Sequence, residues 1–235
     1  MKDRICSGMH FCIEVRDAIS NHIIQSGKRN LLVNGKGPVQ QKEEGYSVFK
    51  WADCDELEIQ MMSYGYKKKR FTIPLTLPVL EVQCMSEGIL YPLCGAFMLS
   101  LVLYPDENYV LPKGYQRAEV SGEPGKIIRV IRDMEKCILL AEEYQGGVFI
   151  QMHVQKGENI RGGYFRIMEG CGMSGEDFVV AGEQEGSGYQ MGRALSRKYP
   201  RGSRIYALYS AQVDETGIAE VIVRNSAVSC LHNSI

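Results

Sequence analysis

The sequence lacks a strong charge of either sign. Its 27 lysines and arginines nearly balance its 28 aspartates and glutamates, which leaves a net charge of −1. No overall field therefore attracts nucleic acid or an anionic membrane. Binding of either kind would have to come from a local patch of basic side chains.

Markers of secretion are also missing. The start of the chain, MKDRICSGMHFC, has no apolar signal-peptide core, and no Asn-x-Ser/Thr acceptor occurs. The eight cysteines form no Cys-x-x-Cys pair. We therefore predict reduced thiols and a cytoplasmic location.

Motifs of the common enzyme classes do not occur. There is no His-Glu-x-x-His segment, no P-loop, and no kinase or hydrolase nucleophile motif. Low-complexity segments and residue-level repeats are absent as well. This pattern favours a non-catalytic protein, and we predict no bound cofactor.

One long apolar run tests whether the chain enters a membrane. Between Glu87 and Asp106 lies GILYPLCGAFMLSLVLYP, which carries no charge and is at the lower length limit for a membrane-spanning helix. Pro92 and Gly95 interrupt it, and its alternation is typical of a strand buried on both faces. We predict a central strand; a membrane-active protein that inserts residues 88–105 is the alternative.

What the sequence does contain is typical of strands and turns. The 25 glycines and 13 tyrosines suit such a protein, and short alternating segments such as ELEIQMMSYGY are separated by turns such as Asn34-Gly35. Strands cluster instead of alternating with helices. We therefore predict an α+β fold with a mostly antiparallel β-rich body, sandwich-like or made of two packed sheets.

Helical spacing of apolar residues predicts three helices in this body. The first covers residues 10–26 and the last, which is short, covers 189–199. The central helix follows residue 126 and ends at Gly146-Gly147, with an apolar face made of Ile127, Ile131, Met134, Ile138 and Ala141. A hairpin of two strands is the alternative for the central segment, because KIIRVI also suits a strand.

The best internal boundary is the segment SGEPGK, residues 121–126. We expect residues 1–235 to form a single compact unit. Two β-rich lobes, 1–122 and 123–235, are the alternative organisation.

A glycine-rich loop follows the apolar segment VVAG. Gly182, Gly186 and Gly188 have the spacing G-x-x-x-G-x-G, which resembles the cofactor loop of short-chain dehydrogenases. That resemblance implies a dinucleotide held by the loop and by the start of the following helix. Glu183 and Glu185 would repel its phosphates. We interpret the loop as a turn between strands, with a nucleotide- or NAD(P)-binding enzyme as the alternative.

The segment YGYKKKRF places aromatic rings beside consecutive cations, which is the chemistry of a groove for single-stranded nucleic acid. A second basic group follows the glycine loop. The predicted nucleic-acid-binding residues are Tyr64, Tyr66, Lys67, Lys68, Lys69, Arg70, Arg197, Lys198 and Arg201. A charged hairpin tip that protects a strand edge is the alternative.

Two further sets of residues have side chains suited to catalysis or metal binding, but nothing in the sequence shows that the members of each set lie close together. Cys171 between glycines and His153 on a polar strand face would form a nucleophile–base pair only within hydrogen-bond reach. The candidate metal ligands are Cys6, His10 and Cys12, joined by Cys230 and His232 if the chain ends meet. We predict neither a catalytic residue nor a metal site from them.

These patterns favour a non-catalytic β-rich binding or assembly subunit of a cytoplasmic or phage/viral-type complex. Its partner would be another protein or a second copy of the chain. Methionine side chains adapt well to a partner surface, and the chain has 11 of them. The alternatives are the nucleic-acid binder, the nucleotide-dependent enzyme and the membrane-active protein.

Overall fold

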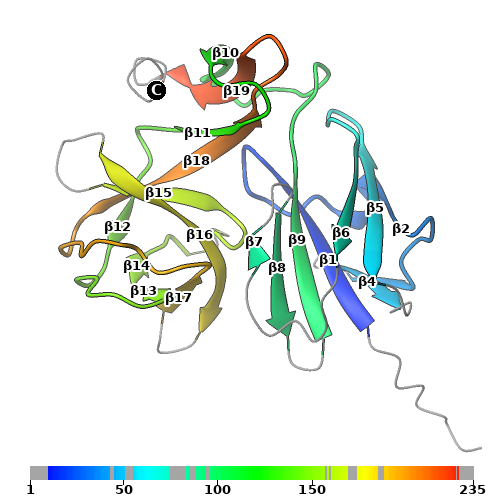
Figure 1. Ribbon diagram of the computed structural model, residues 1–235, viewed down its shortest axis with the longest axis horizontal. Helices are drawn as coiled ribbons and strands as arrows, with labels where there is room; N and C mark the ends of the chain where they lie inside the picture. Colours follow the sequence, from blue (N-terminus) through cyan, green and yellow to red (C-terminus); the bar gives the residue numbers. More distant parts are fainter. Residues whose placement is uncertain are drawn as a thin grey trace, which may run out of the picture. The chain divides into compact units, whose positions relative to one another are not determined.

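The computed structural model describes residues 10–42, 45–50, 55–74, 83–84, 88–93, 96–156, 158, 160–168, 174–184, 188–225 and 227. Almost all of its regular structure is strand (Figure 1). The chain divides into two compact units, Met1–Tyr109 and Val110–Ile235.

The first unit contains two sheets. Their strand orders are β3-β4-β1-β9-β8-β7 and β2-β5-β6. All the pairs are antiparallel except that of β1 with β9, which is parallel. The elements are β1 (His10–Asp17), the 3-10 turn η1 (Ser26–Lys28), β2 (Arg29–Val33), β3 (Gln40–Gln41), β4 (Ser47–Lys50), β5 (Glu56–Ser63), β6 (Lys69–Pro74), β7 (Gln83–Cys84), β8 (Gly88–Leu93) and β9 (Ala96–Leu103).

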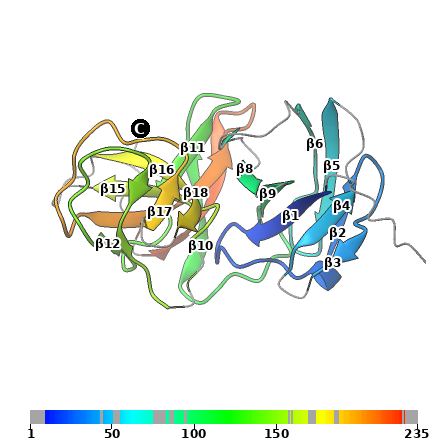
Figure 2. The same ribbon diagram turned by 90° about the horizontal axis from the view of Figure 1, so that it is seen from below.

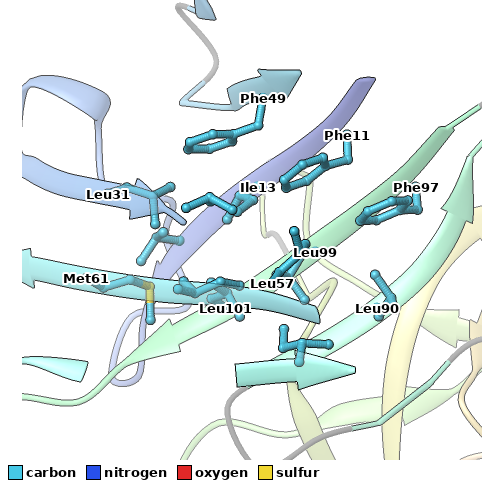
Figure 3. Packing of buried hydrophobic residues seen from close by; sticks show 14 of the residues in the cluster. Phe11, Ile13, Leu31, Phe49, Leu57, Met61, Leu90, Phe97, Leu99 and Leu101 are labelled. Atoms are coloured by element: carbon cyan, nitrogen blue, oxygen red, sulfur yellow. The ribbon is translucent and has the colours of Figure 1, made fainter. Parts of the chain in front are cut away.

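The core of the first unit lies between these two sheets. Side chains from both sheets meet there, as Figure 3 shows. Three aromatic rings on adjacent strands stack along one sheet: the Phe11 ring lies 5.4 Å from that of Phe49 and 5.0 Å from that of Phe97, between centroids. These residues are directly opposite one another in the strand register, which is the arrangement in which cross-strand pairs stabilise a sheet.

The helix predicted over residues 10–26 is wrong, because its first half is β1. Phe11, Ile13 and Val15 alternate along the strand and are buried in the core. That spacing has the period of a strand, and the parallel pairing with β9 satisfies its backbone. The second half of the predicted helix is a turn followed by η1.

The other face of β1 is buried as well, although its side chains are polar. Glu14 and Arg16 are each 0% exposed. The carboxylate oxygen Oε1 of Glu14 accepts hydrogen bonds from Arg16 Nε (2.8 Å), Arg16 Nη2 (2.6 Å) and the Ser100 hydroxyl (2.7 Å). A charged pair is therefore enclosed in the middle of the larger sheet.

The apolar run at 88–105 forms β8 and β9, and β9 lies between β1 and β8. Leu99 and Leu101 face the core, while Met98 and Ser100 are buried on the opposite face. The run is therefore part of a packed sheet. Among the described residues, no helix is long and apolar enough to span a membrane.

The second unit is also built of strands (Figure 2). Its larger sheet has the order β13-β17-β16-β15-β18-β12-β14 with β11 paired to β18, and β10 pairs with β19. The strands are β10 (Tyr115–Ser121), β11 (Ile127–Ile131), β12 (Ile138–Leu140), β13 (Phe149–Ile150), β14 (Met152–His153), β15 (Tyr164–Met168), β16 (Gly175–Gln184), β17 (Gly188–Met191), β18 (Arg204–Gln212) and β19 (Ile218–Arg224).

The central and C-terminal helices are wrong too, so the predicted α+β class with three helices is replaced by a β-rich fold. Residues of the central segment form β11 and β12, which both pair with β18 instead of with each other. The segment 189–199 begins in β17 and continues without helix. The described residues contain no α-helix; the β-rich, mostly antiparallel character is confirmed.

Candidate functional site

A groove lies where three connections of the first unit meet, at one end of its two sheets. They are the segment after β1, the β5–β6 hairpin tip and the segment after β9. One open hollow there has a volume of about 730 Å³, and a neighbouring one of about 540 Å³ shares Lys28, Ser63, Tyr64 and Tyr66 with it. We call the first hollow the tyrosine–lysine groove; it is lined by Lys28, Met62, Ser63, Tyr64, Gly65, Tyr66, Lys67, Lys68, Asp106, Glu107 and Asn108.

Asp17, at the end of β1, ties two of these connections together. Its Oδ1 atom accepts the N–H groups of Ile19 (2.7 Å) and Ser20 (2.6 Å), which fixes the turn that leaves the strand. Its Oδ2 atom accepts the hydroxyl of Tyr66 at 2.6 Å. Asp17 as a whole is 5% exposed, so these bonds replace water that its carboxylate has lost.

Tyr66 extends this network to the third connection. Its ring meets the ring of Tyr109 edge to face, with centroids 5.4 Å apart. Two backbone bonds join the same segments: Lys67 N–H donates to the Tyr104 carbonyl, and Asp106 N–H donates to the Gly65 carbonyl. Burial raises the pKa of Tyr66, and the hydrogen bond to Asp17 raises it further, so the hydroxyl stays protonated as a donor.

Gly65 sets the shape of the hairpin tip. Its φ is +81°, a backbone conformation that residues with a Cβ atom rarely adopt. The turn leaves Tyr64 and Tyr66 in opposite environments, since Tyr66 is half-buried and Tyr64 is 86% exposed. The groove therefore has one fixed tyrosine and one that is open to a ligand.

Lys28, Lys67 and Lys68 give the groove its positive charge. All three side chains are exposed, and none has a carboxylate partner among the residues that the structure describes. Such cations remain available for an anionic ligand.

Two of the predicted nucleic-acid-binding cations are engaged elsewhere. The amino group of Lys69 lies 4.9 Å from the centroid of the Tyr104 ring. Arg70 donates to Glu58 at 2.6 Å across the β5–β6 pair. The hydrogen bonds to Gln60 and Arg70 lower the pKa of Glu58, which therefore stays ionised. Of the predicted segment, Tyr64, Tyr66, Lys67 and Lys68 line the groove.

The second predicted basic group lies in the second unit. Arg197, Lys198 and Arg201 are exposed in the segment between β17 and β18. Glu176 holds this segment to β16 by accepting the backbone N–H groups of Ser196 (2.7 Å) and Arg197 (2.9 Å). Burial acts to raise the pKa of Glu176, but the hydrogen bonds from this segment outweigh it and lower the pKa. The three cations thus stand on an anchored loop.

The glycine loop is a hairpin between β16 and β17. Gly182 lies in β16, Gly188 lies in β17, and their strands pair up to Gln184 opposite Gly188. Gly186 falls outside the described residues. The helix that a dinucleotide loop would place after its last glycine is not present in residues 188–203.

The structure describes only some of the remaining candidate catalytic and metal-binding residues. His153 is exposed in β14, whereas Cys171 lies outside the described residues. Cys6 also lies outside the described residues, and His10 is the first residue of β1. Cys12 is half-buried in β1, and burial raises the pKa of its thiol. Within the described ranges, no group of three His, Cys, Asp or Glu side chains is placed to hold a metal ion.

Sequence reasoning missed Lys28 in the lining of the groove, and also Asp17 and Tyr109, which contact Tyr66 beside it. They come from connections far apart along the chain; Asp17 and Tyr66, for example, are separated by 49 positions. No local pattern joins such residues. Only the YGYKKK segment carried a signal.

Comparison of the chain with protein-family models, curated proteins and solved structures gave no match. The site is therefore interpreted from its own geometry.

Tyr66→Phe tests whether the hydroxyl holds the groove together. The variant keeps the ring and its contact with Tyr109 but leaves Asp17 Oδ2 without this donor. Because hydrogen bonds to charged groups contribute about 1.5–3 kcal/mol, we expect a loss of this size in the free energy of unfolding. Urea denaturation measures it. Tyr64→Phe is the matched control and should leave stability unchanged; an equal loss in both variants would contradict the role of the Asp17 bond.

Proposed function

We propose that this protein is a non-catalytic binding or assembly subunit, and that its first unit contacts a macromolecular partner through the tyrosine–lysine groove. The observation that carries the proposal is Tyr64, whose side chain is 86% exposed on a hairpin fixed by Tyr66 and Asp17. Aromatic anchors contribute much of the affinity of interfaces, and a preorganised loop loses little freedom on binding.

The surroundings of Tyr64 support this role. Met62 is 39% exposed in the same groove, and its unbranched side chain can adapt to the shape of a ligand. A cytoplasmic site of action, which the sequence predicts, is part of the same proposal.

A photoreactive phenylalanine analogue tests the proposal. It is placed at position 64 of the full chain and, as a control, at position 39, where Val39 is 61% exposed outside the groove. In extracts of cells that make the protein naturally, we expect a discrete cross-linked species from position 64 alone. The added change Lys67→Ala/Lys68→Ala should weaken it. Equal products from both positions, or none from position 64, would contradict the proposal.

A further inference from the structure

The tyrosine–lysine groove is lined by three cations as well as by the exposed ring of Tyr64. Lys67 and Lys68 follow Tyr64 in the hairpin, and Lys28 approaches from the end of η1. Neighbouring Lys69 lies over the Tyr104 ring, while Arg70 pairs with Glu58 but keeps a side chain that is 72% exposed. The charge that lines the groove itself comes from the three lysines.

The carboxylates of the groove do not cancel this charge. Asp106 fixes the segment after β9. Its Oδ1 atom accepts a hydrogen bond from the N–H of Asn108 at 2.8 Å, and its own N–H donates to the Gly65 carbonyl. Glu107 is the second carboxylate of the lining. Three lysines against two carboxylates leave a positive surplus at the ring, although the whole chain has a net charge of −1.

The composition of the groove suits a polyanion better than a protein surface. Lysine is depleted in protein interfaces, whose centres are formed by contiguous apolar side chains. Here the exposed apolar side chains are Tyr64 and Met62, and three lysines line the same groove. A single ring flanked by cations matches a chain in which a flat base alternates with a phosphate.

We infer that the occupant of the tyrosine–lysine groove is single-stranded nucleic acid, with one base stacked on Tyr64 and the adjoining phosphates contacted by Lys67, Lys68 and Lys28. This inference rests on the proposed function. Recognition is independent of sequence, because every base presents a flat face to the ring and the lysines contact only the backbone. The half-buried Tyr66 takes no part in stacking and instead positions the hairpin.

Fluorescence anisotropy of the full chain with a labelled oligothymidylate of about a dozen nucleotides tests the inference. Tyr64→Ala should weaken binding about 10-fold, because the stacking of one base on the ring is lost. Tyr64→Phe keeps a stacking face and should bind as the natural protein does. Tyr64 is exposed, so neither variant should alter folding, which circular dichroism verifies.

The salt dependence separates phosphate contacts from stacking. Lys67→Ala/Lys68→Ala should reduce the slope of log K against log salt concentration by about 1.4, which corresponds to two lost phosphate contacts on a single strand. The matched control Lys36→Ala/Lys50→Ala removes two exposed lysines that do not line the groove and should leave the slope unchanged.

Several outcomes would overturn the inference: no binding at low salt, equal binding by Tyr64→Ala, or an equal change of slope in the control variant. Poly-glutamate is the competing probe. If it binds in place of oligothymidylate, the occupant is an acidic polypeptide; the inference then fails while the proposed function stands. Loss of the cross-link from position 64 together with absence of oligothymidylate binding would contradict both.

Discussion

We expect Glu14→Ala to destabilise the first unit by about 3–5 kcal/mol, because the substitution leaves the charge of Arg16 buried without its counter-ion. The side chains of Arg16 and Glu14 are 1% and 0% exposed, and the Glu14 carboxylate receives two of its hydrogen bonds from Arg16. The substitution also removes a charge that acts on half-buried Arg29. Burial lowers the pKa of Arg29 to about 10, while the charge of Glu14 acts to raise it.

Hydrogen exchange of the β1 amides, together with urea denaturation, measures this loss. The matched control is Glu58→Ala, which removes the exposed pair with Arg70 and should change stability little. The double variant Glu14→Leu/Arg16→Met removes both charges and should recover much of the stability, since apolar side chains of similar size often replace a buried ion pair at no cost. Equal effects of Glu14→Ala and Glu58→Ala would contradict the importance of the enclosed pair.

Gly88→Ala should also destabilise the first unit, by about 2–3 kcal/mol. Gly88 begins β8 opposite Leu101 of β9. A Cβ atom at this position would lie 2.0 Å from the carbonyl oxygen of Ser100, which is part of the neighbouring backbone and cannot rotate away. The two strands would have to separate locally.

Thermal unfolding of the full chain measures the effect of this substitution. Gly37→Ala is the matched control, because no atom lies within 4 Å of its added Cβ and its φ is not positive. We expect the control to melt at or slightly above the temperature of the natural protein, since alanine restricts the unfolded chain more than glycine does. If both variants melt at the same temperature, β8 and β9 are not as closely packed as described.

The strand-rich character of the protein was predictable wherever one face of a strand is buried and the other is not. In β5, Leu57, Ile59 and Met61 are buried while Glu56 and Met62 are exposed, and the sequence shows this alternation directly. Each such strand buries one face and leaves the other more exposed to solvent. The prediction of strands there is confirmed.

The helix prediction at the N-terminal strand was wrong for a physical reason. In β1, Glu14 and Arg16 are buried with Phe11 and Val15, so the polar residues do not mark a solvent-facing side. The apolar residues alone then fit a helical period as well as a strand period. The long-range pairing with β9 decides between them, and no short window of sequence contains it.

The candidate site was predictable only in part. Tyr64, Lys67 and Lys68 are consecutive enough to give a local signal. Lys28 reaches the groove from another connection, and Asp17 bonds Tyr66 from beside it; the positions of both depend on the stacking of two sheets. Which tyrosine is buried and which is open also depends on Asp17, the partner of Tyr66. Local sequence therefore predicts the chemistry of the hairpin but not the groove around it.

The parallel pairing of β1 with β9 has a consequence for how the protein is made. Glu14 and Ser100, which bond across these strands, are 86 positions apart. During synthesis β1 therefore leaves the ribosome long before its partner β9. The polar side chains of β1 remain hydrated until the two strands pair. Topologies closed by such distant contacts assemble slowly, because a long loop must be ordered before the contact forms. Collapse of the first unit has to wait until its last strand has emerged.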